Sequence, residues 1–285
     1  VESGCRPPVI PQGVFPDMIN LLQYDFFCNA LVAVVIIAVA SAVIGTYIVT
    51  RRLVAISGGI THACFGGLGL GYYFGLSPVA MAAAVAVVSG LAVEWMSGRG
   101  RMREDSAIAV IWSLGMAAGV IFVFLTPGYV PELNTFLFGN LLTVGRSDLL
   151  AFGVYAAVLI AFYVFCRRIV VACAFDRDFA RVIHLPVGLI NCVMMVFIAV
   201  GIVLTIRLVG IMLLMSMLTL PQLTAEVYAR RFDGILLLSA VVSVVCGVGG
   251  LMLATVIDVP CSALIVLLQA AVYFAARCFR ALVWR

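Results

Sequence analysis

The chain has 285 residues, of which 65% are hydrophobic and only 11% are charged, and its mean hydropathy is +1.23. Soluble domains are about half apolar and a quarter charged, so this composition excludes a soluble globular protein. The net charge is +4, and all 17 basic residues are arginines. Because the apolar runs are continuous rather than alternating, they exclude a membrane β-barrel and predict an all-α polytopic membrane protein.

The first 25 residues lack the apolar core of a signal peptide and are expected to form an external or interfacial segment. A transmembrane domain is expected to follow over 26–285. Its long apolar runs predict about eight or nine transmembrane helices. The working set of nine spans is 26–50, 54–74, 77–96, 106–126, 148–166, 187–206, 208–228, 234–256 and 261–276.

The arginines orient these nine spans. If the first span runs from outside to inside, only Arg6, Arg146 and Arg207 lie outside, and every other arginine lies on the cytoplasmic side. The positive-inside rule predicts such an asymmetry. We therefore expect an external N-terminus and a cytoplasmic C-terminus.

The second span carries small residues and a histidine. Small residues recur every four positions at Gly59, Ala63, Gly67 and Gly71, which leaves one helix face bare enough for another helix to approach closely. His62 lies beside that face. An imidazole inside an apolar span is costly unless it meets water, a partner side chain or an ion. His62 is therefore a candidate contact for an ion, although a hydrogen bond to a neighbouring helix would explain it equally well.

The segment over about 173–187 joins the fifth and sixth spans and mixes acids, arginines and apolar residues. This mixture predicts a short amphipathic helix on the membrane surface, beginning at about Asp178. The chain has no nucleotide-binding P-loop. The short helix is therefore either a docking site for a separate motor or a solvated connector.

Polar residues in the last third of the chain are candidates for a gate or a polar path. Pro221 removes one backbone hydrogen bond from its helix, and Gln222 and Glu226 follow closely. Ordinary structure explains them too, because membrane helices tolerate proline and Glu226 falls near the headgroups. Asp258 lies in the tight external turn before the last span, where turn chemistry is a sufficient explanation and a gate role is open.

A series of motifs extends these features over nearly the whole chain. In order, they are YDFFCNAL, GTYIVTRRLVAISGGITHACFGGLGLGYYFG, REDSAIAVIWSLGMAAGVI, LNTFLFGNLLTV, FDRDFARVIHLPV, GIMLLMSMLTLPQLTAEVYARRF and IDVPCSALIVLLQ. This series resembles bacterial ABC transporter permeases of the metal-ion type, the membrane subunits of zinc, manganese and iron uptake systems.

The resemblance implies an all-helical permease that works as a homodimer in the bacterial inner membrane. Its partners would be two cytoplasmic ATPases, which bind ATP, and an extracytoplasmic metal-binding protein, with no nucleic acid involved. The chain itself would carry no enzymatic activity and no bound cofactor. The residues that would couple it to the ATPases are Asp178, Ala180, Arg181, His184 and Pro186.

The same resemblance makes His62 the contact for the transported ion. Gly58 stands where the family has an aspartate, and we expect it to leave room beside His62 for a carbonyl or a water. His184 occupies the position of a usual glycine in the coupling segment.

The implied function is ATP-driven import of a divalent transition-metal ion by alternating access. The alternative within the same class is a permease for a chelated metal or a cobalamin-like substrate, which needs a wider path. An intramembrane enzyme is disfavoured because the chain contains neither G-x-S-x-G nor C-x-x-C. A purely structural subunit would have no reason to carry His62 inside a span.

Overall fold

The computed structural model describes residues 24–98, 102–127, 139, 141, 144–257 and 259–283. Within these ranges the regular structure is helical and no strand occurs, which confirms the all-α class. The helices are α2 (Asp25–Thr50), α3 (Ala55–Phe74), α4 (Pro78–Gly98), α5 (Glu104–Leu125), α7 (Arg146–Phe175), α8 (Arg177–Val182), α9 (Val187–Met217), α10 (Leu220–Tyr228), α11 (Phe232–Ile257) and α12 (Cys261–Val283).

Most of these helices begin and end within a few residues of the predicted spans. The main exception is α7, which continues to Phe175 although the apolar run ends before Arg167 and Arg168. A helix of 30 residues is about 45 Å long, whereas the hydrocarbon core is about 30 Å thick. The last turns of α7 therefore extend beyond the apolar layer, and both arginines on them are exposed.

Seven helices in the described chain are long and apolar enough to cross a membrane, and one of them is the 42-residue stretch Val187–Tyr228. This stretch is not one straight crossing. Gly210 has φ 78° and ψ 173° inside α9 and divides it into two helical pieces. The predicted pair of spans 187–206 and 208–228 therefore corresponds to two passes, separated a few residues later than expected.

The contacts of this stretch show that it turns back on itself. Asn191, near its start, donates a hydrogen bond to Glu94. Glu226, near its other end, lines a cavity together with Arg51, which itself forms an ion pair with Glu94. Arg207, close to Gly210, instead pairs with Asp148 near the start of α7, at 3.4 Å. With α3 included and Val187–Tyr228 counted as two passes, the described chain runs nine times between the two ends of the bundle.

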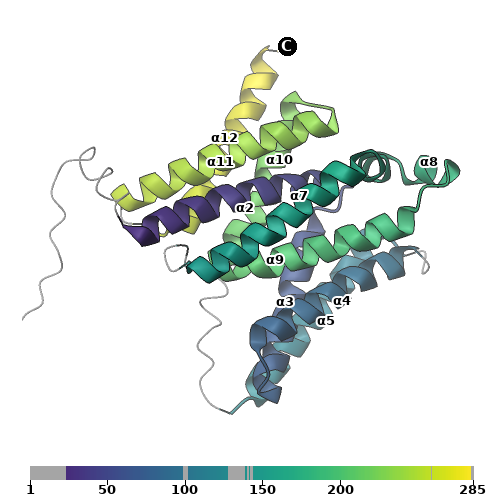
Figure 1. Ribbon diagram of the computed structural model, residues 1–285, viewed down its shortest axis with the longest axis vertical. Coiled ribbons are helices and arrows are strands. Elements are labelled where there is room, and N and C mark those ends of the chain that lie inside the picture. Colours follow the sequence, from purple (N-terminus) through teal and green to yellow (C-terminus); the bar gives the residue numbers. More distant parts are fainter. Residues whose placement is uncertain are drawn as a thin grey trace, which may run out of the picture.

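The two ends of the bundle differ in charge. One end, called here the arginine-rich end, carries Arg51, Arg52, Arg167, Arg168, Arg177, Arg181, Arg230, Arg231, Arg277 and Arg280. At the opposite end Arg146 pairs with Asp25, and Arg207 pairs with Asp148. Figure 1 shows α8 beyond the right-hand ends of α7 and α9, so that it projects from the arginine-rich end.

The bundle has two parts. Helices α2, α7, α9 and α11 run alongside one another, and α3, α4 and α5 gather at the bottom of the view (Figure 1). The bare face predicted on α3 is confirmed, because two helices approach it closely. A Cβ added at Gly67 would lie 2.6 Å from the Met81 carbonyl oxygen of α4, and one added at Gly115 of α5 would lie 2.4 Å from the Ala63 Cα. This close packing buries most of α3 and fixes the position of His62 against α5.

Candidate functional site

His62 lies at the edge of α3, where its imidazole stacks on the indole of Trp112 from α5. The ring centroids are 4.5 Å apart and the planes are 12° from parallel. His62 is half-buried, and Trp112 keeps 37% of its surface exposed. The stacked pair therefore borders open space at the surface of this single chain, and one face of the imidazole is held by the indole.

Gly58 lies one turn before His62 on the same face of α3. A Cβ added at Gly58 would lie 3.0 Å from the Met215 methyl carbon Cε and 3.3 Å from the Trp112 ring. The space that we expected to hold a carbonyl or a water is therefore filled by a thioether side chain and an indole. In the described residues, no three His, Cys, Asp or Glu side chains come close enough together to hold a metal ion.

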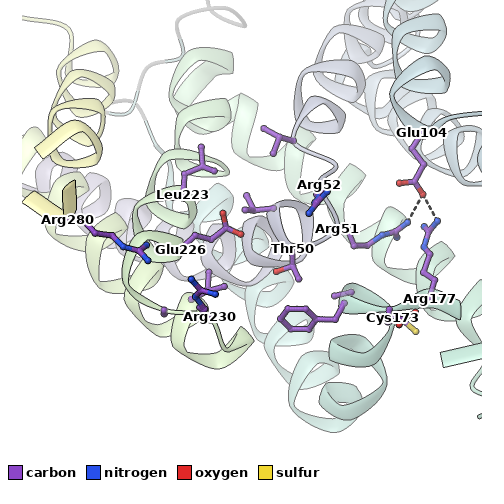
Figure 2. Close-up of a pocket in the computed structure, with 17 residues that line it drawn as sticks. Thr50, Arg51, Arg52, Glu104, Cys173, Arg177, Leu223, Glu226, Arg230 and Arg280 are labelled. Atoms are coloured by element: carbon purple, nitrogen blue, oxygen red, sulfur yellow. Dashed lines mark hydrogen bonds and ion pairs between the residues drawn. The ribbon is translucent and has the colours of Figure 1, made fainter. Parts of the chain in front are cut away.

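Met215 belongs to a partly exposed face that runs along the second pass of Val187–Tyr228. The members of this face recur every three or four residues, while the residues between them are mostly buried. They are Met212, Met215, Thr219, Leu223 and Glu226. The last two also line a cavity of about 890 Å³ at the arginine-rich end, and the Glu226 side chain points into it in Figure 2. The face therefore runs from the level of the His62–Trp112 pair to the arginine-rich end.

The other gate candidates lie in different surroundings. Pro221 is buried in the first turn of α10, where proline is well tolerated, so it begins a helix rather than bending one. Gln222 is fully buried and its amide nitrogen donates to the Ser41 carbonyl at 3.0 Å, which anchors α10 on α2. Glu226 is exposed to the cavity. Asp258 lies outside the described residues, and the gate roles stay predictions.

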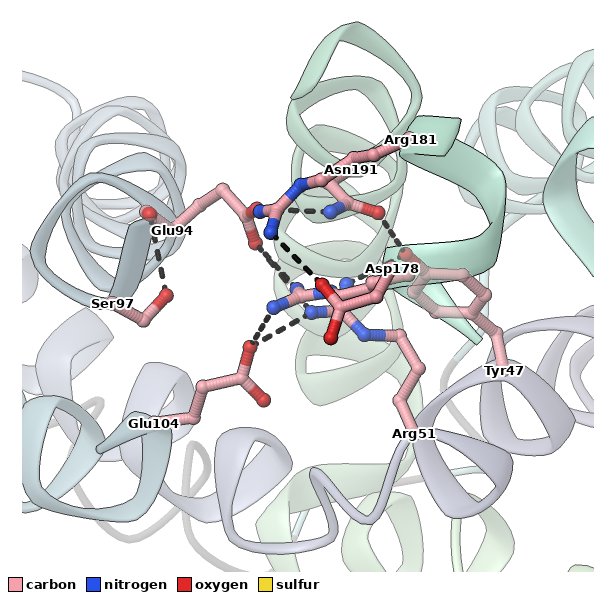
Figure 3. A network of polar contacts seen from close by, with 9 residues as sticks. Tyr47, Arg51, Glu94, Ser97, Glu104, Asp178, Arg181 and Asn191 are labelled. Carbon is pink, nitrogen blue, oxygen red and sulfur yellow. Dashed lines mark hydrogen bonds and ion pairs between the residues drawn. The ribbon is translucent and has the colours of Figure 1, made fainter. Parts of the chain in front are cut away.

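A polar network at the arginine-rich end was not predicted from the sequence. It consists of Tyr47, Arg51, Glu94, Glu104, Arg177 and Asn191, called here the arginine–glutamate network (Figure 3). Its members come from α2 and its C-cap, α4, α5, α8 and α9. It therefore joins five helices at the place where the coupling segment leaves the bundle.

Two arginines and two glutamates neutralise one another in this network. Arg51 donates to Glu104 at 2.9 Å, and Arg177 donates to Glu104 and, at 3.2 Å, to Glu94. The Arg51 side chain is only 3% exposed. Burial opposes its charge, but Tyr47 and the two glutamates favour it more strongly, so the pKa of Arg51 is raised above its ordinary value. Arg51 therefore stays charged, and the hydrogen bonds of Arg177 tie α8 to the bundle.

The asparagine and tyrosine complete the network. The Tyr47 hydroxyl accepts from Arg51 at 2.7 Å and donates to Asn191 at 2.9 Å, while the Asn191 amide donates to Glu94 at 3.0 Å. Of the buried side-chain polar atoms in this network, only Arg177 Nε has no hydrogen-bond partner. The only sequence signal was that Arg51, Glu94 and Glu104 lie at ends of predicted spans and that Arg177 lies in the predicted coupling segment.

Helix α8 is the short amphipathic helix that the sequence predicted, and it begins at Arg177, one residue before the expected start. The Asp176 carboxylate caps it by accepting from the backbone nitrogens of Asp178 and Phe179, at 3.0 and 2.9 Å. Among the predicted coupling residues, Ala180 is fully buried. Asp178, Arg181, His184 and Pro186 are exposed. Exposed Phe179, Val182 and Ile183 add an apolar surface beside them.

The turn after α8 explains why a glycine would suit position 184. His184 has φ 58°, in the left-handed region that glycine adopts without cost. Its backbone nitrogen donates to the Arg181 carbonyl, and that of Leu185 donates to the Ala180 carbonyl, both at 3.0 Å. These bonds close the helix end and hold the histidine in a strained conformation.

Comparisons with known proteins place this architecture in a family. The ABC 3 transport family matches residues 23–280. The chain is 36% identical to a probable metal transport system membrane protein of Chlamydia pneumoniae, over 85% of each protein. It is 30% identical to the manganese transport system membrane protein MntC of Halalkalibacterium halodurans, over 90% of this chain and 88% of that protein. The chain is also 30% identical to a probable iron transport system membrane protein of Haemophilus influenzae, over 92% of this chain and 97% of that protein.

A solved structure shares the fold. A chain of PsaBC from Streptococcus pneumoniae in complex with Fab matches with a TM-score of 0.79 and 24% identity, covering 92% of this chain and 94% of that one. The family match and the structural match both cover almost the whole described chain. The protein is therefore a multi-pass membrane protein that belongs to the ABC 3 transport family.

Proposed function

We propose that this protein is the permease subunit of an ATP-driven importer for a divalent transition-metal ion: zinc, manganese or iron. Membership of a transport family supports the transport class, and the names of two relatives support manganese or iron as cargo. The observation that carries the proposal is the half-buried imidazole of His62, held by Trp112 beside a partly exposed helix face.

The ligands at this place suit transition metals. Imidazole nitrogen binds zinc, manganese and ferrous iron, whereas magnesium and calcium prefer a shell made only of oxygen. The Met215 thioether near Gly58 adds a softer group. A site with so few ligands holds an ion weakly, which a transported ion requires in order to leave.

The arginine-rich end faces the cytoplasm in this proposal, which puts the N-terminus outside and the C-terminus inside the bacterial inner membrane. Helix α8 then presents its exposed surface to a cytoplasmic ATPase subunit, which binds and hydrolyses ATP. A second copy of the chain covers the open side of the His62–Trp112 pair, and an extracytoplasmic metal-binding protein delivers the ion.

Alternating access follows from these contacts. Movement of the ATPases displaces α8, and Arg177 transmits the displacement to α2, α4 and α5 through the arginine–glutamate network. The partly exposed face from Met212 to Glu226 offers the ion a route from His62 to the arginine-rich end. No chemistry occurs on this chain in this mechanism.

Transport by reconstituted vesicles tests the proposal. The vesicles contain the protein with its ATPase and its binding protein, and uptake of zinc, manganese and ferrous ions is measured. We expect His62→Ala to lower uptake at least tenfold while the protein level stays the same. Ser113→Ala is the matched control, because Ser113 is the exposed neighbour of Trp112 and bonds only its own helix.

The outcomes test the role of His62 and the transport function separately. Unchanged uptake by His62→Ala would remove His62 from the path and leave the transporter assignment standing. Failure of the unmodified protein to move any of the three ions would end the proposal. Competition between free ions and chelates distinguishes the alternative substrate class. The tight filling around Gly58 favours the bare ion.

A further inference from the structure

Two cavities meet at the arginine-rich end. The larger, of about 890 Å³, lies between the ends of α2, α7, α10 and α12 and is lined by Arg51, Arg52, Arg177, Arg230 and Arg280, against Glu104, Asp176 and Glu226. The second, of about 670 Å³, shares Arg230 and Arg280 with the first and adds Arg231, with no acidic residue in its lining. Arg230 and Arg280 therefore stand where the two cavities join.

The positive charge at this junction is largely uncompensated. Arg51 and Arg177 are neutralised in the arginine–glutamate network, and Arg52 lines the larger cavity together with Glu226. Within the described ranges, Arg230 and Arg231 form no ion pair, and Arg280 donates only to the Val227 carbonyl. Figure 2 shows the Arg230 and Arg280 side chains directed toward the space near Glu226.

We propose that this junction binds a phosphate group through Arg230 and Arg280, with Arg52 and Arg231 contributing charge. Guanidinium groups suit this ligand because their planar donors match phosphate oxygens in pairs. Arginines outnumber carboxylates in the lining of both cavities, and the smaller cavity has no acidic residue in its lining, so the junction attracts a phosphate dianion or a lipid phosphodiester more than any cation. The proposal does not depend on which substrate the protein transports.

The surroundings allow the phosphate to arrive on a lipid. Large apolar side chains lie exposed next to the junction, among them Tyr228, Leu237, Phe279 and Leu282. Acyl chains can lie along these residues while the headgroup enters the cavity, as expected for basic pockets between helices at a membrane surface. A free phosphate ion would use the same arginines without the apolar neighbours.

The test compares two phosphate sources with the full-length protein in a mild detergent. One arm counts phosphatidylglycerol and phosphatidylcholine molecules retained by the protein in native mass spectrometry, and the other measures thermal stabilisation by inorganic phosphate. We expect Arg230→Gln and Arg280→Gln each to weaken binding roughly tenfold, the effect of losing one charge-assisted contact. Arg168→Gln is the matched control, because Arg168 is exposed at the same end and lines neither cavity.

Each outcome decides the proposal. Preferential retention of phosphatidylglycerol, lost in the two cavity variants and kept in the control, supports it with a lipid as the source. Thermal stabilisation by inorganic phosphate that is lost in the two cavity variants and kept in the control supports the proposal with a soluble phosphate ion as the source. The proposal is overturned if neither probe binds or if the three variants behave alike. It is also overturned if the cavity variants bind both probes normally and only their assembly with the ATPase is weakened. Unchanged melting temperatures without phosphate show that the variants are folded.

Discussion

The His62 imidazole of α3 lies flat against the Trp112 indole of α5, with centroids 4.5 Å apart. Because the rings are stacked, the imidazole plane lies nearly parallel to the indole plane. We infer that the indole holds the imidazole at the open side of the chain, where the proposed ion path runs. In this proposal Trp112 positions His62.

Replacing this indole should weaken ion binding without abolishing transport. An aromatic pair contributes about 0.5–1.5 kcal/mol, so we expect Trp112→Leu to raise the KM for ion uptake roughly two- to tenfold with little change in kcat. The initial rate of uptake against ion concentration checks this. Trp95→Leu is the control, because Trp95 is 62% exposed on α4. Equal effects of the two substitutions would refute the positioning role.

Gly58 offers a second prediction, because the aspartate usual at this position would meet occupied space. A Cβ there lies 3.0 Å from Met215 Cε, so Gly58→Asp should destabilise the protein by about 1–3 kcal/mol. Adding Met215→Ala should recover much of this loss. Melting temperatures of the single and double variants form a cycle that measures the coupling. Strictly additive effects would show that Met215 does not occupy the aspartate position.

The helices could be predicted largely from the sequence, because hydropathy and helix length are local properties. The arginine–glutamate network could not. Arg51 and Glu104 are 53 residues apart, and Glu94 and Arg177 are 83 apart. In the sequence, each looks like a solvated residue at the end of a span or in a connecting segment, until packing brings them together. The spans 187–206 and 208–228 placed the break between two passes at Arg207, but nothing in the apolar run marked Gly210 as the residue that carries it.

The arginine–glutamate network should be sensitive to loss of one carboxylate. Glu104→Gln leaves the buried Arg51 and the partly buried Arg177 facing one remaining glutamate, and we expect it to cost about 2 kcal/mol or more. Asp105→Asn is the control, because Asp105 is 66% exposed and pairs with an 85% exposed Arg103 at 3.8 Å, and it should cost less than about 0.5 kcal/mol. Thermal unfolding of the two variants checks this difference, and comparable losses would contradict it.

The left-handed turn after α8 should accept glycine better than histidine. With φ at 58°, His184 carries a steric cost of about 1–2 kcal/mol. Glycine avoids this cost but loses more conformational entropy on folding, which cancels part of the gain. His184→Gly should therefore stabilise the coupling segment by about 0.5–1 kcal/mol, whereas His184→Ala should not. Hydrogen exchange of the α8 amides measures the local change. Equal protection in the two variants would mean that the turn is unstrained.

The break in α9 depends on two glycines from distant parts of the chain. Gly210 has φ 78° and ψ 173°, a combination essentially reserved for glycine. Gly139, with φ 63°, packs so closely that a Cβ on it would lie 2.2 Å from the Gly210 nitrogen. Either glycine replaced by alanine must move the backbone, so Gly210→Ala and Gly139→Ala should each cost about 2 kcal/mol or more.

A third glycine supplies the control for this break. Gly153 lies inside α7 with nothing within 4 Å of an added Cβ, so Gly153→Ala should be neutral or stabilise by up to about 1 kcal/mol. The melting temperatures of Gly210→Ala and Gly139→Ala should therefore lie below that of the unmodified protein, and the melting temperature of Gly153→Ala should lie at or above it. If Gly210→Ala melted at or above the unmodified protein, α9 could continue as a straight helix, and the return of the chain toward the arginine-rich end would need another cause.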